Sequence, residues 1–107
     1  MRPGDANETA IAWKTILEKT NGPAAICLSR QNVPTFDRVI FAPAELTARG
    51  AYVMADGTDV ILIGTGSEVQ IAVAARELLA TDGISARVVS MPCVEWFKEE
   101  DASYQEG

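Results

Sequence analysis

The chain has 107 residues, 48% of them hydrophobic, and a formal net charge of −6 from 9 basic and 15 acidic side chains. This charge disfavours a nucleic acid as partner, because phosphates require a basic surface, and no apolar run approaches the roughly 20 residues of a membrane span. The chain has no histidine, the commonest general acid or base near neutral pH, which disfavours a self-contained hydrolase or metal site. We expect a cytoplasmic protein with two reduced cysteines.

Residues 5–19 are expected to form a helix. Asp5 and Glu8 have the spacing of a capping box, and Asn-Gly-Pro at residues 21–23 is typical of a helix end. An apolar stripe at helical spacing is made of Ala10, Trp13, Ile16 and Leu17. The pattern predicts that this stripe, including Trp13, faces a core.

Residues 24–29 are apolar without alternation, which predicts a strand buried on both faces, with Cys27 in the core. Arg30 follows this strand directly. Ligands collect outside the carboxyl ends of strands in open parallel sheets, and a guanidinium matches phosphate or carboxylate oxygens. Arg30 is therefore a candidate anion contact, with ordinary pairing to a surface carboxylate as an equal alternative. Gln31 and Asn32 could assist a ligand, but turn-forming and capping roles suit them better.

Residues 31–50 show no regular spacing of apolar residues, and only residues 39–41 are apolar enough for a short extended piece. So long a stretch without a clear element is unusual inside a compact domain. It indicates an interdomain linker that lies along a surface. A helix and a fully apolar strand cannot be stable alone, so residues 1–30 are expected to belong to a larger sheet.

The second half is more regular. We expect a short edge strand at residues 52–54, a buried strand at 59–64 and a strand at 84–91. Between the last two, a helix is expected to begin with a second capping box, Ser67 and Gln70, and to end near Ala80 before Asp82-Gly83. Its inward side chains would be Val69, Ala72, Val73 and Leu79.

A strand, a helix and a strand in this order form a βαβ unit with parallel strands and a right-handed crossover. Another helix is expected at residues 94–101, with Trp96 and Phe97 as core candidates. The predicted fold class is α/β, built of parallel-sheet βαβ units from pieces of two adjacent domains joined by a linker.

Residues 64–68 (Gly-Thr-Gly-Ser-Glu) lie where phosphate-binding loops lie, between a strand and a helix. However, Val69 replaces the third glycine of the dinucleotide fingerprint, no lysine follows, and Glu68 would repel a phosphate. A structural tight turn is the better interpretation.

The remaining candidates also have simple structural explanations. Cys93 lies near a helix start, where the pKa of a thiol can fall, but without a nearby histidine or second cysteine an inert buried thiol is favoured. We interpret Asp5 as a helix cap. The acidic residues near the end are expected to form a solvated face, not a metal cluster: Glu95, Glu99, Glu100 and Asp101.

Five segments together resemble transketolase, in an order and spacing that match this family over nearly the whole chain. They are residues 2–8 (Arg-Pro-Gly-Asp-Ala-Asn-Glu), 28–32 (Leu-Ser-Arg-Gln-Asn), 48–53 (Ala-Arg-Gly-Ala-Tyr-Val), 64–69 (Gly-Thr-Gly-Ser-Glu-Val) and 86–92 (Ala-Arg-Val-Val-Ser-Met-Pro). Deoxyxylulose-phosphate synthase and pyruvate dehydrogenase β subunits share the domain plan, but the Ser-Arg-Gln-Asn run favours transketolase.

The resemblance implies that residues 1–34 end the pyrimidine-binding domain, 35–50 form the linker and 51–107 begin the carboxyl-terminal domain. The parent enzyme would transfer a two-carbon ketol unit between phosphorylated ketoses and aldoses, as a cytoplasmic homodimer. Arg30 matches the family's arginine that holds the sugar phosphate.

The parent would use thiamine diphosphate and Mg²⁺ or another divalent cation. The family's Gly-Asp-Gly motif for diphosphate and metal lies in an amino-terminal domain, and residues 4–6 (Gly-Asp-Ala) do not replace it. No catalytic, cofactor-binding or metal-binding residue of the family is expected in this chain, which alone is expected to be inactive.

Two other interpretations stay open. The chain could be a free-standing α/β module that binds phosphate at residues 64–68. It could also have a structural role as a subunit-docking piece, mainly through residues 50–107.

Overall fold

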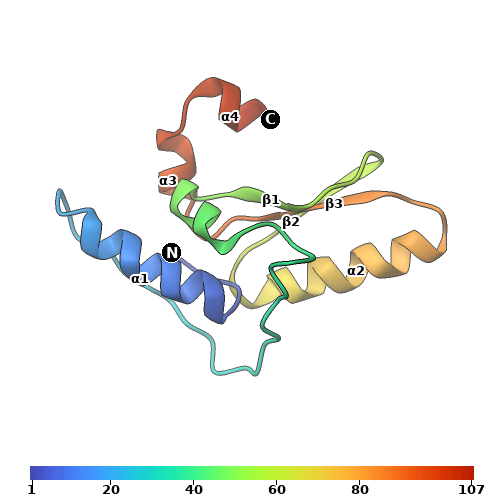
Figure 1. The fold of residues 1–107 in the computed structure, drawn as a ribbon, viewed down its shortest axis with the longest axis horizontal. Helices are drawn as coiled ribbons and strands as arrows, with labels where there is room; N and C mark the ends of the chain where they lie inside the picture. Colours follow the sequence, from blue (N-terminus) through green and yellow to red (C-terminus); the bar gives the residue numbers. More distant parts are fainter.

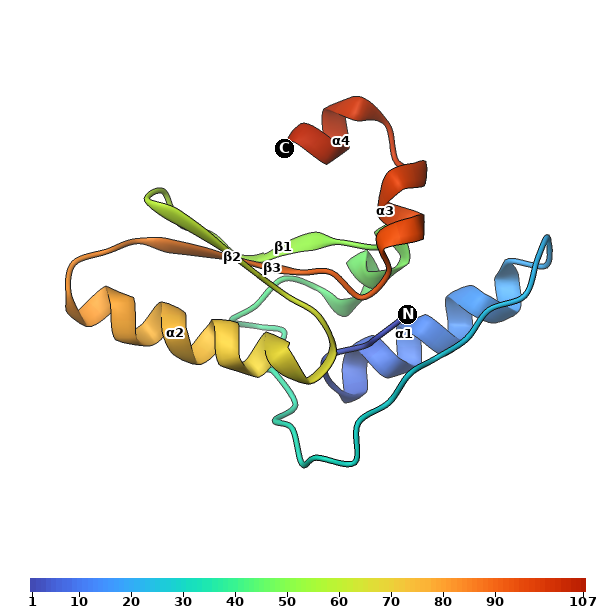
Figure 2. The ribbon, with the colours of Figure 1, turned by 180° about the vertical axis from the view of Figure 1, so that it is seen from behind.

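A computed structural model describes residues 1–107, and it confirms the α/β class. Three strands form one sheet in the order β1-β3-β2 (Figure 1): β1 (Tyr52–Ala55), β2 (Val60–Gly64) and β3 (Ala86–Ser90). The helices are α1 (Ala6–Glu18), α2 (Val69–Thr81), α3 (Val94–Glu99) and α4 (Ala102–Glu106), with 3-10 helices η1 (Ala44–Arg49) and η2 (Gly66–Glu68). Helix α2 lies along one face of the sheet, and α3 and α4 lie on the other side (Figure 2).

The predicted βαβ unit is present as β2, α2 and β3. Strands β2 and β3 pair in parallel from Val60 opposite Ala86 to Gly64 opposite Ser90. The sheet as a whole is mixed, because the edge strand β1 pairs antiparallel with β3. Only residues 56–59 join β1 to β2, and parallel strands need a connection of about a dozen residues or more. A short turn therefore reverses the chain here.

Helix α1 begins as predicted, but it presents the opposite face to the protein. The Asp5 side chain accepts a hydrogen bond from Glu8 N (2.8 Å) and caps the helix. Trp13 is 53% exposed and Leu17 73% exposed, whereas the buried side chains of the helix are Glu8, Ala12 and Thr15. The prediction of Trp13 in the core is wrong, since α1 packs with its polar side against η1 and the sheet.

Residues 24–29 form no strand, and Cys27 is exposed, so both predictions for this segment are wrong. A strand without a polar face needs ladder partners on its edges and cover on both faces. The only backbone partner near its centre is Met1, whose carbonyl oxygen accepts from Cys27 N (2.9 Å). The segment therefore runs as an isolated extended chain.

Residues 31–50 contain more structure than predicted. Phe36 is buried in the core cluster with Met54, Val69 and Val88, and η1 occupies the end of the stretch. The expected extended piece at residues 39–41 is wrong, because a turn lies there with Val39 and Ile40 exposed.

Helix α2 begins at Val69, with Glu68 in place of Ser67 at the N-cap, one residue later than predicted, because η2 precedes it. Ser67 makes no capping hydrogen bond, so the second capping box is wrong. The inward side chains are confirmed for Val69, Ala72 and Val73, which are buried, and Leu79 is partly buried. The helix ends as predicted, with Gly83 at φ +78°.

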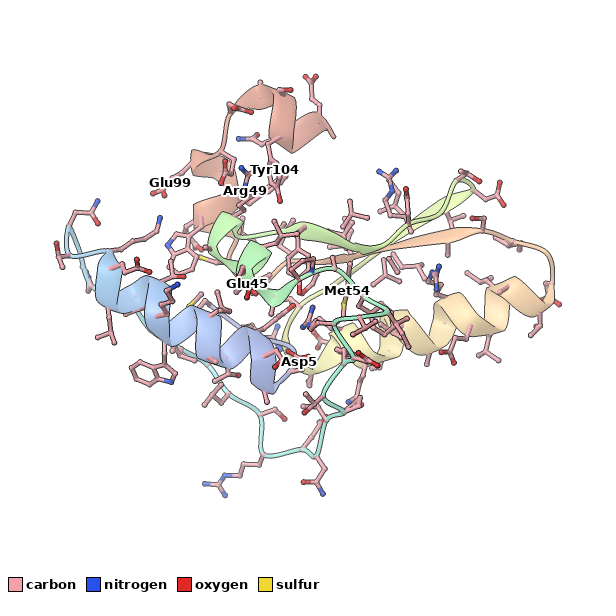
Figure 3. All side chains as sticks on the ribbon, in the orientation of Figure 1. Asp5, Glu45, Arg49, Met54, Glu99 and Tyr104 are labelled. Carbon is pink, nitrogen blue, oxygen red and sulfur yellow. The ribbon has the colours of Figure 1, made fainter.

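The last two helices follow β3 closely. Helix α3 confirms the predicted element, with Trp96 and Phe97 partly buried. Helix α4 is fixed by Tyr104, whose hydroxyl donates to Ala51 O (2.7 Å) and whose ring lies under the Arg49 guanidinium at 4.4 Å (Figure 3). None of the helices combines the length and apolar character that crossing a membrane requires.

Candidate functional site

Arg30 lies exposed at a bend that follows the extended segment. The Ser29 hydroxyl accepts a hydrogen bond from Gln31 N (2.9 Å), which fixes the bend locally. The Arg30 guanidinium forms no ion pair with a carboxylate of residues 1–107.

A cavity of about 480 Å³ is lined by the chain neighbours of Arg30, Ser29 and Gln31, but not by Arg30 itself. Three parts of the chain enclose it: the start of α1, the extended segment and η2. Its lining includes Asp5, Thr9, Ser29, Gln31, Asn32, Thr35 and Ser67. The structure thus brings Gln31 and Asn32 together with Asp5, which sequence analysis treated only as a helix cap.

Asp5 is buried, and both of its carboxylate oxygens accept hydrogen bonds from groups of the protein. Both carboxylate oxygens lie 2.9 Å from Arg38 Nη2. Oδ1 also accepts from Glu8 N (2.8 Å), and Oδ2 from Phe36 N (3.0 Å). The carboxylate therefore connects α1, Phe36 and Arg38 (Figure 3 labels Asp5 at the amino end of α1).

Glu8 connects the start of α1 to the sheet through hydrogen bonds. Its Oε2 accepts from the Tyr52 hydroxyl and the Ser90 hydroxyl, each at 2.6 Å, and its Oε1 accepts from Gly4 N (2.8 Å). Arg38 Nη1 donates to the Tyr52 hydroxyl (2.8 Å). We call these five side chains the buried network: Asp5, Glu8, Arg38, Tyr52 and Ser90.

Burial is the main cause that raises the pKa of Tyr52 above its usual value, and the adjacent Glu8 carboxylate adds to it. For Arg38, burial alone would lower the pKa, but Tyr52 and Asp5 together raise it. The tyrosine thus stays a neutral donor, and the arginine stays the cation that balances two buried carboxylates. No sequence pattern marks Arg38, which lies in the stretch without periodicity.

The turn at residues 64–68 fits the structural interpretation. Gly66 has φ +59°, and its N–H donates to Arg2 O (2.9 Å). Glu68 Oε2 lies 3.6 Å from Arg2 Nη2, and Glu68 N donates to Thr65 O (3.2 Å). The Gly66 and Glu68 N–H groups are therefore already used within the protein.

The other candidates are in structural positions. Burial raises the pKa of the Cys93 thiol, which lies 3.5 Å from Glu95 Oε2, as an inert thiol would. Glu99 pairs with Lys19 at 3.4 Å, and Asp101 caps α4 through Tyr104 N.

No group of three or more His, Cys, Asp or Glu side chains in residues 1–107 is placed to hold a metal ion. The carboxylates of Asp5 and Glu8 are occupied by protein donors. The residues present therefore do not fit a metal site.

Comparison with known proteins gives one consistent result. The family described as "Transketolase-like TK C-terminal domain" matches residues 50–107, more than half of the chain. The chain is 53% identical to a Mycobacterium tuberculosis transketolase, over 99% of this chain and 16% of the relative. It is 49% identical to an Aquifex aeolicus transketolase over 98% of this chain and 16% of the relative.

Solved structures agree. A Leishmania mexicana transketolase superposes with a TM-score of 0.88 at 35% identity, covering 99% of this chain and 16% of that one. A Pichia stipitis transketolase in complex with sedoheptulose-7-phosphate gives a TM-score of 0.86 at 39% identity, covering 97% of this chain and 15% of that one. The chain thus spans about one sixth of the length of the relatives it matches.

Proposed function

Because this chain belongs to the transketolase family, we propose that it works within a longer transketolase and binds the phosphate of the sugar substrates through Arg30. The reaction is the transfer of a two-carbon ketol unit between phosphorylated ketoses and aldoses. The observation that carries this proposal is the exposed position of Arg30 at a bend whose neighbouring residues, Ser29 and Gln31, line a cavity. The Pichia stipitis relatives crystallised with phosphorylated sugars support the substrate class.

The cofactor would be thiamine diphosphate with Mg²⁺ or another divalent cation, which supplies the chemistry of ketol transfer. We propose that it is held by protein outside residues 1–107, because these residues include no fitting metal site. The resemblance also supports a cytoplasmic, homodimeric enzyme. We also propose that residues 1–34 end the pyrimidine-binding domain, that residues 35–50 form a linker and that residues 51–107 begin the carboxyl-terminal domain.

Arg30 would bind at a distance from the reacting carbons. Binding energy from such a remote group orients the reacting end of the substrate. A hydrogen bond to a charged group contributes about 1.5–3 kcal/mol. Loss of the Arg30 contact should therefore weaken the binding of phosphorylated substrates roughly ten- to a hundredfold.

The experiment uses a full-length chimaera in which residues 1–107 replace the corresponding segment of the Mycobacterium tuberculosis transketolase. Arg30→Ala should raise KM for ribose phosphate and leave KM for ribose unchanged. Arg30→Lys should give a KM for ribose phosphate between those of the parent chimaera and Arg30→Ala. Lys14→Ala, an exposed basic residue on α1, is the matched control and should change neither. The proposal would be contradicted if Arg30→Ala raised KM equally for ribose phosphate and ribose, or if the parent chimaera were inactive.

A structural docking role is the second candidate. Exposed apolar side chains on α1 and on the partly covered sheet face favour it, namely Trp13, Leu17, Ile61 and Ile63. It predicts that the 107-residue protein co-purifies with a larger thiamine-binding chain. It fails if the two chains, mixed at micromolar concentration, elute separately.

A further inference from the structure

We propose that Arg38 is a positioning residue that fixes the Arg30-bearing segment through Asp5 and the backbone of Phe36. This inference rests on the proposed function, because it concerns the phosphate contact at Arg30. Arg38 does not touch the substrate in this proposal. Its side chain is only 15% exposed and faces Asp5, Tyr52 and Ala42.

The segment that carries Arg30 is attached to the rest of the protein at its two ends. At one end, Cys27 N donates to Met1 O (2.9 Å). At the other, Phe36 N donates to Asp5 Oδ2 (3.0 Å) and Phe36 O accepts from Asn7 Nδ2 (3.3 Å). Between these points the only side-chain hydrogen bond is local, between Ser29 and Gln31. The place of Arg30 therefore depends on the two attachments.

Arg38 controls the second attachment. Its Nη2 contacts both oxygens of Asp5 at 2.9 Å, and Oδ2 is the atom that receives Phe36 N. A buried carboxylate without its cation recruits water or moves toward solvent, because burial of an unpaired charge is costly. Either change releases the Phe36 N–H and, with it, the end of the Arg30 segment.

The fork of the arginine is needed as well as its charge. While Nη2 binds Asp5, Nη1 donates to Ala42 O (3.0 Å) and to the Tyr52 hydroxyl (2.8 Å). One rigid group thus holds α1, the turn before η1 and β1 in a fixed relation. A lysine has one nitrogen and cannot make these contacts together.

The test uses the same chimaera with Arg38→Lys. We expect KM for ribose phosphate to rise at least about fivefold, since small displacements of a positioning group are costly, with kcat and KM for ribose unchanged. Because Arg38 acts through Arg30, Arg38→Lys should add nothing in an Arg30→Ala background. Asn7→Ala loosens the same attachment without a buried charge and should raise KM for ribose phosphate in the same direction.

A control separates this effect from general destabilisation. Arg76→Lys alters another partly buried arginine, which donates to Ala86 O, and should leave both KM values unchanged. The inference is overturned if Arg38→Lys and Asn7→Ala leave KM for ribose phosphate unchanged, raise KM for both sugars equally, or act additively with Arg30→Ala. If Arg30→Ala itself shows no selectivity, the proposed function fails instead.

Discussion

Two carboxylates are buried at the start of α1, and Arg38 is the cation near both. Asp5 contacts the Arg38 guanidinium at 2.9 Å, whereas Glu8 lies 4.0 Å from it and accepts hydrogen bonds from the neutral hydroxyls of Tyr52 and Ser90. Hydrogen bonds to a charged group in a low-dielectric interior are stronger than those in water, but an unpaired buried charge is correspondingly costly. The buried network is therefore the part of the protein most sensitive to single substitutions.

Replacement of Tyr52 by Phe removes one donor from Glu8 and one acceptor from Arg38. We expect the free energy of unfolding of the 107-residue protein to fall by about 1.5–3 kcal/mol, the usual contribution of a hydrogen bond to a charged group. Urea denaturation followed by circular dichroism measures it. Val53→Ala, on the opposite face of the same strand, is the control for β1 packing. A Tyr52→Phe protein as stable as the parent would contradict the role given to Glu8.

The raised pKa of Tyr52 gives a pH dependence with a definite sign. In the unfolded chain a tyrosine loses its proton near pH 10, while folded Tyr52 keeps it. Above that pH the folded state binds more protons than the unfolded state, so stability falls as pH rises. Below it, the Tyr52 contribution is fully present.

We expect the stability of the parent to decline more steeply above about pH 10 than that of Tyr52→Phe. Subtraction of the two denaturation curves removes the contributions of the other titrating groups. Parallel curves from neutral to strongly alkaline pH would show that Tyr52 ionises as freely in the folded protein as in the unfolded chain.

Helix α1 shows most clearly what the sequence could and could not predict. Its start, its cap and its end follow from local chemistry, and these were predicted correctly from Asp5, Glu8 and residues 21–23. Which face it buries depends on partners distant in sequence, such as Tyr52 and Ser90. Local periodicity contains no information about those partners, so the exposed Trp13 was predicted in the core.

The order of elements in the βαβ unit was predicted well for the same reason, but the prediction that its first strand is buried is wrong, because Ile61 and Ile63 are each 61% exposed. Strand β2, helix α2 and strand β3 are consecutive, and the crossover through α2 at residues 65–85 sets the parallel pairing of the two strands. The segment at residues 24–29 has strand composition but no neighbouring strands, so its composition misled the prediction. The role of Arg38 was not predicted, because a single arginine in a stretch without periodicity forms no recognisable sequence pattern.

The contact between η1 and α3 depends on one glycine. Gly50 has φ +87°, and a Cβ there would overlap the backbone of Cys93 and Phe97. We expect Gly50→Ala to separate α3 from η1 and to lower the thermal midpoint strongly. Gly22→Ala is the matched control, since a Cβ at Gly22 meets no atom within 4 Å, and it should be neutral or slightly stabilising. Equal midpoints for the two variants would refute the close approach.

At the scale of the whole molecule, the sheet face opposite α2 is only partly covered, by α3 and α4. Ile61 and Ile63, each 61% exposed, point away from α2 and line a cavity of about 850 Å³ between the sheet and α4. Together with the exposed stripe on α1, this leaves large apolar surface in contact with water, which marks an interaction face in soluble proteins. It agrees with the proposal that residues 1–107 work within a longer protein.

This surface should be measurable in the 107-residue protein. We expect it to bind a hydrophobic fluorescent dye, and the double variant Ile61→Thr, Ile63→Thr to bind less dye at nearly unchanged stability, since threonine keeps strand propensity. Val88→Thr alters a fully buried position on β3 and should destabilise the fold. Undiminished dye binding by the double variant would place the apolar surface elsewhere.

The central claim is that this chain supplies a phosphate contact while the cofactor chemistry lies outside it. The most direct test compares sugar turnover by the purified 107-residue protein and by the transketolase chimaera, each with thiamine diphosphate, Mg²⁺, xylulose phosphate and ribose phosphate. We predict turnover by the chimaera, weakened selectively for the phosphorylated sugars by Arg30→Ala, and none by the 107-residue protein. Turnover by the 107-residue protein alone would contradict the account.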